Sequence, residues 1–211
     1  MKDQEIPPKN PVVLVHGILR PASIFNTMSA YLSDRGWPVY ALNMKQYNGI
    51  IGLDLLAKQV AEYVENTFPP QQPIDLVGLS MGGIVSRYYV QRLEGIKRVQ
   101  RLITIGSPHY GTRMAYFLPL PGCLQMRPGS LFLQDLNHDV EMLGQIKFTS
   151  IWTPYDFIIV PAASAAQVRI EATKQLLGKE KKVLVFAHAM LVRNNKTLQA
   201  VAEALNEPIE L

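Results

Sequence analysis

The sequence predicts an α/β protein with a mostly parallel sheet and helices on both faces. Short apolar runs alternate along the chain with longer segments in which apolar residues recur at helical spacing. Most of the apolar runs are continuous rather than alternating, which is typical of parallel strands buried on both faces. A chain of 211 residues is an ordinary size for a single hydrophobic core, so we expect one domain over residues 1–211.

The strands are expected at the apolar runs, which are bounded by proline, glycine or polar residues: 12–15, 39–42, 74–77, 102–105, 148–152 and 183–186. The helices are expected where the apolar spacing is three or four residues: 23–35, 53–68, 83–93, 130–137 and 195–205. Ser23 is a candidate N-cap of the first helix, and Gly36 is its stop signal. The segment 162–178 is ambiguous, and Lys179–Lys182 is interpreted as a solvated turn.

The composition excludes several classes of protein. A net charge of +4 without a clustered basic stripe argues against nucleic-acid binding, and a weak attraction to membrane surfaces stays open. Cys123 is the single cysteine, so the chain forms no internal disulfide, which suits a reducing compartment. The first residues lack a signal-peptide pattern, and no apolar run reaches the roughly 18 residues of a membrane span. We therefore expect a cytoplasmic protein.

The motif Gly78-Leu79-Ser80-Met81-Gly82 follows an expected strand directly and opens an expected helix. A sharp turn at that place points the serine hydroxyl into a cleft at the carboxyl edge of the sheet. Side chains at Gly78 or Gly82 would strike the neighbouring strand or helix. The pattern predicts that Ser80 is a catalytic nucleophile; the alternative is a glycine-rich turn without chemistry.

A serine hydroxyl is a poor nucleophile without a general base. Of the four histidines, His188 follows the last expected strand and precedes the final helix, in the chain order Ser, acid, His. We predict that His188 is the base. His16 and His109 also follow strands, whereas His138 lies at a polar helix end and has an ordinary exposed interpretation.

The acid that orients the base should lie between the serine and the histidine in the chain. Asp156 follows the strand at 148–152 and is flanked by apolar residues, where a carboxylate needs a partner. We predict that Asp156 is this acid; the alternative is an aspartate that caps the loop. Asp135, Asp139, Glu171 and Glu180 are the other candidates, and each lies in polar or charged surroundings.

An oxyanion intermediate needs two backbone N–H donors that point at one place. The residue after the nucleophile, Met81, supplies one of them. The other is expected from a loop that ends a neighbouring strand, and Ile18 in His16-Gly17-Ile18 is the candidate.

With these residues placed, the chain resembles small bacterial triacylglycerol lipases and esterases of the α/β-hydrolase superfamily. The resemblance implies the α/β-hydrolase fold and hydrolysis of esters without a metal or cofactor. It also implies that His16 and His109 are structural or pocket-lining residues. It rests on Val13–Gly17, Gly78–Arg87, Ile105–Thr112, Asp156 with Val160-Pro161 and Ser164, and His188.

The sequence departs from longer lipases in the segment available for a lid. Only residues 111–128 could serve, so we expect at most a minimal lid and little activation at lipid interfaces. The segment is either a loop packed on the core or an apolar wall for the acyl chain. On the second interpretation, its substrate-pocket candidates are Met114, Phe117 and Leu118.

Three hypotheses about function follow. The first is a serine hydrolase acting on lipid or small esters of apolar acyl groups. The second keeps the same triad and acyl-enzyme but transfers the acyl group or cleaves thioesters. The third is a non-catalytic α/β-hydrolase scaffold, which the presence of all three triad residues disfavours. Peripheral membrane contact stays open, and the pattern does not indicate an oligomeric state.

Overall fold

The computed structural model describes residues 9–170 and 173–209. Within these residues the chain forms a six-stranded sheet of order β2-β1-β3-β4-β5-β8, in which neighbouring strands are parallel. The strands are β1 (Val12–Val15), β2 (Val39–Leu42), β3 (Ile74–Leu79), β4 (Val99–Ile105), β5 (Lys147–Trp152) and β8 (Lys179–Lys182). A separate antiparallel pair consists of β6 (Val168–Arg169) and β7 (Leu176–Leu177).

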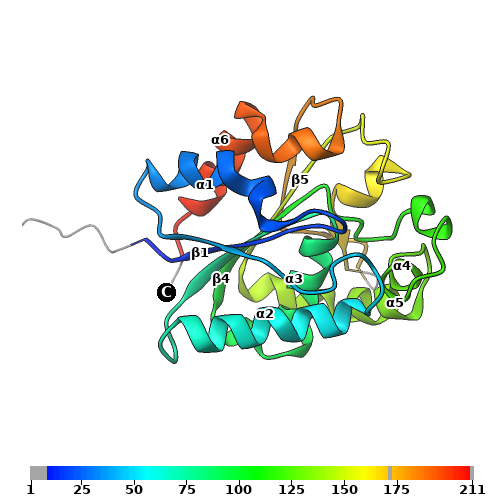
Figure 1. The fold of residues 1–211 in the computed structure, drawn as a ribbon, viewed down its shortest axis with the longest axis horizontal. Coiled ribbons are helices and arrows are strands. Elements are labelled where there is room, and N and C mark those ends of the chain that lie inside the picture. The colour runs from blue at the N-terminus through cyan, green and yellow to red at the C-terminus, as the bar shows by residue number, and fades with distance from the viewer. Residues whose placement is uncertain (1–8, 171–172, 210–211) are drawn as a thin grey trace, which may run out of the picture.

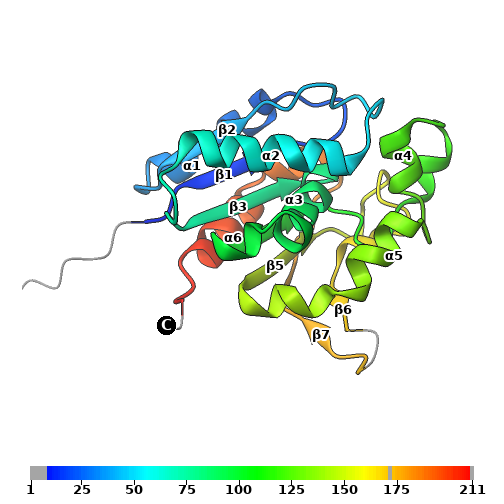
Figure 2. The same ribbon diagram turned by 90° about the horizontal axis from the view of Figure 1, so that it is seen from below.

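Helices cover both faces of the sheet (Figure 1). One face carries α1 (Asn26–Ser33) and α6 (Asn195–Leu205), and the other carries α2 (Leu53–Thr67) and α3 (Met81–Arg92). Figure 2 shows α4 (Pro121–Gln125) and α5 (Leu131–His138) together at one end of the molecule. The short 3-10 helices are η1 (Ala22–Phe25), η2 (Gly95–Lys97), η3 (Arg113–Tyr116), η4 (Val140–Gln145), η5 (Ala162–Ala165) and η6 (His188–Arg193).

This arrangement confirms the predicted α/β class. Side chains of β1 alternate between two hydrophobic clusters: Val13 and Val15 join the cluster with α2 and α3, whereas Val12 and Leu14 join the one with α1 and α6. Both faces of the strand are therefore buried, which explains its continuous apolar run. None of the helices in the described ranges has the length and apolar character needed to cross a bilayer.

The sheet order changes direction at β1, which pairs with β2 on one side and β3 on the other. In parallel sheets, ligands bind outside the carboxyl ends of strands at such a switch point. The register pairs Val15 of β1 with Gly78 of β3. Residues that follow these two strands, among them Gly17 and Ser80, consequently meet at one edge of the sheet.

The prediction for the last strand was wrong. Lys179–Lys182 forms the edge strand β8, parallel to β5, while 183–186 lies outside any strand. Val183 and Val185 are buried, but Leu184 and Phe186 are exposed, so the apolar run is only half in the core. A lysine-rich sequence suits β8 because charged side chains protect an exposed sheet edge from pairing with other chains.

Other boundaries differ by a few residues. Ser23 lies inside η1, where Pro21 holds the N-cap position, so Ser23 is not a cap. Gly36 has φ +84°, as a helix stop requires. The ambiguous segment 162–178 contains η5 followed by the β6–β7 hairpin.

Asp75 in β3 gives the fold a pH-dependent contribution to stability. Its carboxylate is fully buried and accepts hydrogen bonds from Arg101 and Asn10. Burial raises the pKa of Asp75 to about 6, although both partners oppose the shift. The folded state therefore binds this proton more tightly than the unfolded chain. The contribution is fully present below about pH 4 and is lost as the pH rises to about 6.

We expect the free energy of unfolding to lose at most about 3 kcal/mol from this source between pH 4 and pH 7. Asp75→Asn lacks the titration, so the stability difference between the two proteins should change over that range. Urea denaturation of both proteins at a series of pH values measures it. Parallel stability curves would contradict the assignment.

Candidate active site

Ser80 occupies the turn between β3 and α3 in a strained backbone conformation. Its φ is +54° and its ψ −123°, which few non-glycine residues adopt. The Ser80 N–H donates to the Ile105 carbonyl at 2.8 Å, and the Gly83 N–H donates to the Ser80 carbonyl at 3.0 Å. The side chain is 8% exposed. The turn therefore presents the hydroxyl at the carboxyl edge of the sheet, directly before the N-terminus of α3.

The flanking glycines allow this turn to pack closely. A Cβ on Gly78 would lie 2.5 Å from the Gly83 Cα, and one on Gly82 would lie 2.1 Å from the Val15 carbonyl oxygen. Both positions meet backbone atoms, which cannot move aside as a flexible side chain would. Glycine is therefore the residue that fits at both positions, as the motif predicts.

Asp156 and His188 form a direct hydrogen bond. Oδ2 of Asp156 lies 2.6 Å from Nδ1 of His188. The other carboxylate oxygen, Oδ1, accepts the N–H groups of Ile158 and Ile159 at 2.9 and 3.0 Å. Every oxygen of this buried carboxylate is thus paired, and one of them orients the imidazole.

The other candidate acids have different partners. Asp135 and Asp139 pair with Arg92 on the protein surface. Glu180 accepts the indole N–H of Trp152. Glu171 lies outside the described residues.

Ser80 and His188 line one cavity of about 230 Å³. Nε2 of His188 is buried and has no hydrogen-bond partner in the described part of the chain. The structure thus brings the serine and the Asp156–His188 pair to one cavity without a closed serine–histidine hydrogen bond, and such bonds are often loose in free enzymes. The lining residues are Gly17, Ile18, Leu19, Arg20, Ile24, Leu79, Ser80, Ile158, His188 and Ala189.

Ile18 and Met81, the two predicted oxyanion donors, come from elements on either side of Ser80 in the site. Ile18 lines the cavity, and Met81 is the first residue of α3 after Ser80. A Cβ on Gly17 would lie 3.7 Å from Ser80 Oγ, which shows how closely the loop after β1 approaches the hydroxyl. The loop after β1 and the start of α3 thus both lie next to Ser80, and the assignment of the Ile18 and Met81 N–H groups as oxyanion donors stays a prediction.

His16 holds the loop that bears Ile18. Nε2 of His16 accepts the Met44 N–H at 3.0 Å, so Nδ1 carries the proton and donates to the Gly17 carbonyl at 3.0 Å. That carbonyl and the Ile18 N–H belong to one planar peptide, so fixing the first orients the second. Burial lowers the pKa of His16, which keeps the ring neutral. Both ring nitrogens are occupied, so this histidine is not free to act as a base.

The remaining two histidines also have partners. His109 is fully buried, with Nδ1 accepting from Arg87 and Nε2 bonded to the Thr104 hydroxyl. Burial and the Arg87 charge hold the pKa of His109 well below its usual value. His138 is exposed and bonds its neighbour Asp139.

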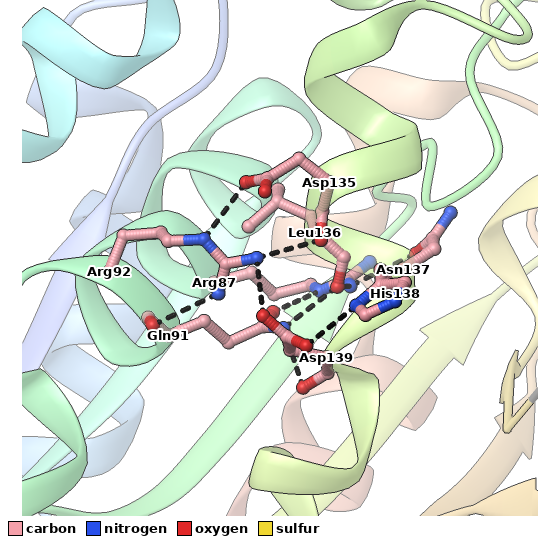
Figure 3. Close-up of polar contacts among 8 residues, drawn as sticks. All are labelled: Arg87, Gln91, Arg92, Asp135, Leu136, Asn137, His138 and Asp139. Carbon is pink, nitrogen blue, oxygen red and sulfur yellow. Dashed lines mark hydrogen bonds and ion pairs between the residues drawn. The ribbon is translucent and has the colours of Figure 1, made fainter.

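Arg87 is a feature that sequence reasoning missed. It is fully buried on α3 and donates to Gln91, to the Leu136 carbonyl and to Asn137 at 2.9–3.1 Å (Figure 3). It also donates to His109. Burial lowers the pKa of Arg87 to about 10, so it stays charged at neutral pH. The network joins the helix behind Ser80 to α5 and to the loop after β4.

The predicted pocket residues do not line this cavity. Met114, Phe117 and Leu118 are 39%, 76% and 45% exposed. The walls come instead from residues adjacent to the motifs, such as Leu19 after Ile18 and Ala189 after His188. The residues that line the cavity could thus have been predicted from their position next to Ile18, Ser80 and His188 in the sequence. The apolar content of 111–128 did not indicate them.

Gly106 packs closely against the His188 ring. It has φ +55°, and a Cβ there would lie 3.0 Å from His188 Cε1 and 3.2 Å from Nδ1. We expect Gly106→Ala to displace the imidazole and lower kcat by about 10- to 100-fold, since small misplacements of catalytic groups have effects of this size. Ester hydrolysis and thermal unfolding of the purified variant measure the two consequences.

Gly36→Ala is the matched control. Gly36 also has a positive φ, +84°, but within the described part of the chain its added Cβ would meet no atom within 4 Å beyond its own chain neighbours. Both variants should lose about 1–2 kcal/mol of stability from the left-handed backbone, and only Gly106→Ala should lose activity. Equal activities would contradict the contact with His188.

The parallel sheet with its switch at β1 and the strained serine between strand and helix define an α/β-hydrolase. Residues 11–155 match the family model described as palmitoyl protein thioesterase. This match covers more than half of the chain, so the chain belongs to that family. The matched region includes Ser80 and ends one residue before Asp156.

Curated relatives agree with the predicted resemblance to bacterial lipases. Triacylglycerol lipases of Pseudarthrobacter phenanthrenivorans and Burkholderia plantarii are each 28% identical to this chain over 116 residues. These residues are 51% of this chain but 36% and 32% of the two relatives. The chain thus spans about a third of the length of the curated relatives it matches.

Solved structures share the fold over nearly the whole chain. Lipase B of Aspergillus fumigatus superposes with a TM-score of 0.77 at 18% identity, covering 96% of this chain and 54% of the lipase. A Bacillus licheniformis lipase in its mature form gives a TM-score of 0.68 at 17% identity, covering 96% of this chain and 94% of that one. The predicted α/β-hydrolase fold is confirmed.

Proposed function

We propose that this chain hydrolyses carboxylic esters of apolar acyl groups, with Ser80 as nucleophile, His188 as general base and Asp156 as the acid that orients it. The observation that supports this most directly is the 2.6 Å hydrogen bond from His188 Nδ1 to Asp156, on a histidine that lines the same cavity as Ser80. The triacylglycerol lipases among the relatives support the same reaction class.

In the proposed reaction, Ser80 Oγ attacks the ester carbonyl carbon while Nε2 of His188 takes its proton. The oxyanion that forms accepts the N–H groups of Ile18 and Met81. The tetrahedral intermediate then loses the alkoxide, which takes the proton from His188 and leaves as the alcohol. Water, deprotonated by His188, attacks the acyl-enzyme, releases the carboxylic acid and restores Ser80.

The cavity indicates the size and polarity of the substrate. Its volume of about 230 Å³ lies below the roughly 300–1,000 Å³ of pockets for drug-sized ligands. Most of its walls are apolar, and its polar side chains are those of Arg20, Ser80 and His188. These properties favour a short or medium apolar acyl group. Leu19 lines the cavity and is exposed, and exposed Phe157 and Met190 each adjoin a lining residue in the sequence. We propose that these three side chains would contact a lipid aggregate.

Turnover of p-nitrophenyl esters of graded acyl length tests the proposal. We expect a maximum of kcat/KM at short or medium chains and no sharp rate increase above the micellar limit, because the segment 111–128 is short. A maximum at the longest chains would contradict the assigned acyl cavity. No turnover of any ester by a folded protein would contradict the reaction class.

A thioesterase is the second candidate, and the family match favours it. Both activities pass through the same acyl-enzyme, so the site geometry does not separate them. Oxyesters and thioesters of one acyl group, assayed side by side, do. A kcat/KM that is much higher for the thioester would move the proposal to this second activity.

An acyltransferase would share the same intermediate and differ in the acceptor. Competing alcohols added to the assay distinguish it, because transfer yields a new ester while hydrolysis yields only the acid. Acid as the sole product at high alcohol concentration excludes the transferase.

A further inference from the structure

Asp156 and His188 follow the neighbouring strands β5 and β8, but the pairing of these strands ends before either residue. The last cross-strand pair is Trp152 with Lys182, and one further backbone bond joins the Val183 N–H to the Trp152 carbonyl at 2.8 Å. Beyond it, no backbone–backbone hydrogen bond connects the two loops within the described residues. The sheet alone therefore does not set the distance between acid and base.

The Thr153 hydroxyl joins the two loops at this point. Its Oγ1 donates to the Val185 carbonyl at 2.8 Å and accepts the Val185 N–H at 3.3 Å. It also accepts the Tyr155 N–H at 3.3 Å. A hydroxyl has one donor and two acceptor positions, so this one is fully used. In effect, one side chain satisfies both backbone groups of Val185, as a paired strand residue would.

The two ends of this bridge lie at equivalent positions before Asp156 and His188 in the sequence. Thr153 is three residues before Asp156, and Val185 is three residues before His188. Thr153 is 1% exposed and Val185 5%, so water does not readily replace the bridge. Unpaired backbone groups of a buried residue are costly, so the hydroxyl stabilises the approach of the second loop to the first at Val185.

The other contacts hold each member of the pair on its own side: η6, which begins at His188, buries Leu191 and Val192 in the cluster with α1 and α6. Two N–H groups of its own loop fix the Asp156 carboxylate, and Gly106 backs the His188 ring.

The rings of Tyr155 and Phe186 stack across the loops at 4.6 Å. Both rings are exposed, and two stacked rings can slide past each other at little cost. This contact therefore joins the two loops without fixing the distance between Asp156 and His188.

We propose that Thr153 is a positioning residue for the triad, whose hydroxyl bridge to Val185 keeps Asp156 within hydrogen-bond reach of His188. This inference rests on the proposed function of the triad. Thr153 touches no substrate and acts through the geometry of the acid–base pair.

Thr153→Val removes the hydroxyl while keeping the shape of the side chain, and Thr153→Ser keeps the hydroxyl. We expect Thr153→Val to lower kcat by about 10- to 100-fold with little change in KM, and Thr153→Ser to stay within about threefold of the wild type. The matched control is Thr197→Val, which removes a buried hydroxyl that has no hydrogen-bond partner among the residues the structure describes. It should leave kcat unchanged. If Thr153→Val does not fold, Thr153→Ala replaces it in the comparison with Thr153→Ser.

Combination with Asp156→Asn distinguishes positioning from general stability. If Thr153 acts through the pair, Thr153→Val should lower kcat much less in the Asp156→Asn background than in the wild type. A full effect in both backgrounds, an equal loss in Thr153→Ser, or an unchanged kcat in folded Thr153→Val would overturn the inference. Wild-type protein that neither cleaves an activated ester nor reacts with a fluorophosphonate would overturn the proposed function, and this inference with it.

Discussion

Replacing Ser80 by alanine is expected to lower kcat for ester hydrolysis by about 10⁴- to 10⁶-fold while leaving the fold intact. The change removes the one atom proposed to form the acyl-enzyme. The two hydrogen bonds that hold the turn, to the Ile105 carbonyl and from the Gly83 N–H, both use the Ser80 backbone and stay in place. Residual turnover should reflect only the oxyanion donors and the cavity. Initial rates with an activated ester, together with covalent labelling by a fluorophosphonate, measure the effect.

Ser86→Ala is the control for this variant. Ser86 is also a buried serine on α3, but its hydroxyl donates to the Gly82 carbonyl one turn earlier. Loss of such a bond within a helix has little effect, so activity and labelling should persist. Retained hydrolysis in Ser80→Ala would remove the serine from the mechanism. Retained biological activity without hydrolysis would instead favour the scaffold hypothesis.

The parts of the fold that the sequence predicted correctly are those whose local pattern agrees with their tertiary surroundings. Residues 12–15 are buried on both faces and are apolar throughout. The turn at Ser80 is recognisable because backbone atoms surround its glycines, which leaves little freedom of residue type. The Asp156–His188 contact agrees with a simple order of residues along the chain, although 32 positions separate them.

The incorrect or missing predictions concern features that depend on distant partners. β8 is a strand because its backbone pairs with β5, and its lysines only show that it lies at an edge. Arg87 is buried because acceptors about 50 positions away, Leu136 and Asn137, meet its guanidinium. The side chains of Met114 and Phe117 turn to the surface, which periodicity does not reveal. Composition cannot report such contacts, since they form only when the elements pack.

Asp156→Asn is expected to lower kcat by about 10⁴-fold, because a neutral amide in place of the carboxylate favours the wrong tautomer of the histidine. In the wild type, Asp156 Oδ1 accepts the N–H groups of Ile158 and Ile159, and Oδ2 faces Nδ1 of His188. The amide oxygen of asparagine should keep the two backbone bonds, since an NH₂ group cannot accept them. The NH₂ group then faces Nδ1 and donates to it.

Nδ1 must accept that bond, so the proton of a neutral imidazole moves to Nε2, the nitrogen proposed to take the proton of Ser80. A protonated Nε2 cannot take the proton of the serine, although the geometry of the loop is preserved. Asp135→Asn is the control, because it makes the same exchange at an exposed surface pair with Arg92. Thermal unfolding should be similar in the two variants. Near-normal turnover in Asp156→Asn would show that another group orients His188, and the 2.6 Å contact would then be structural only.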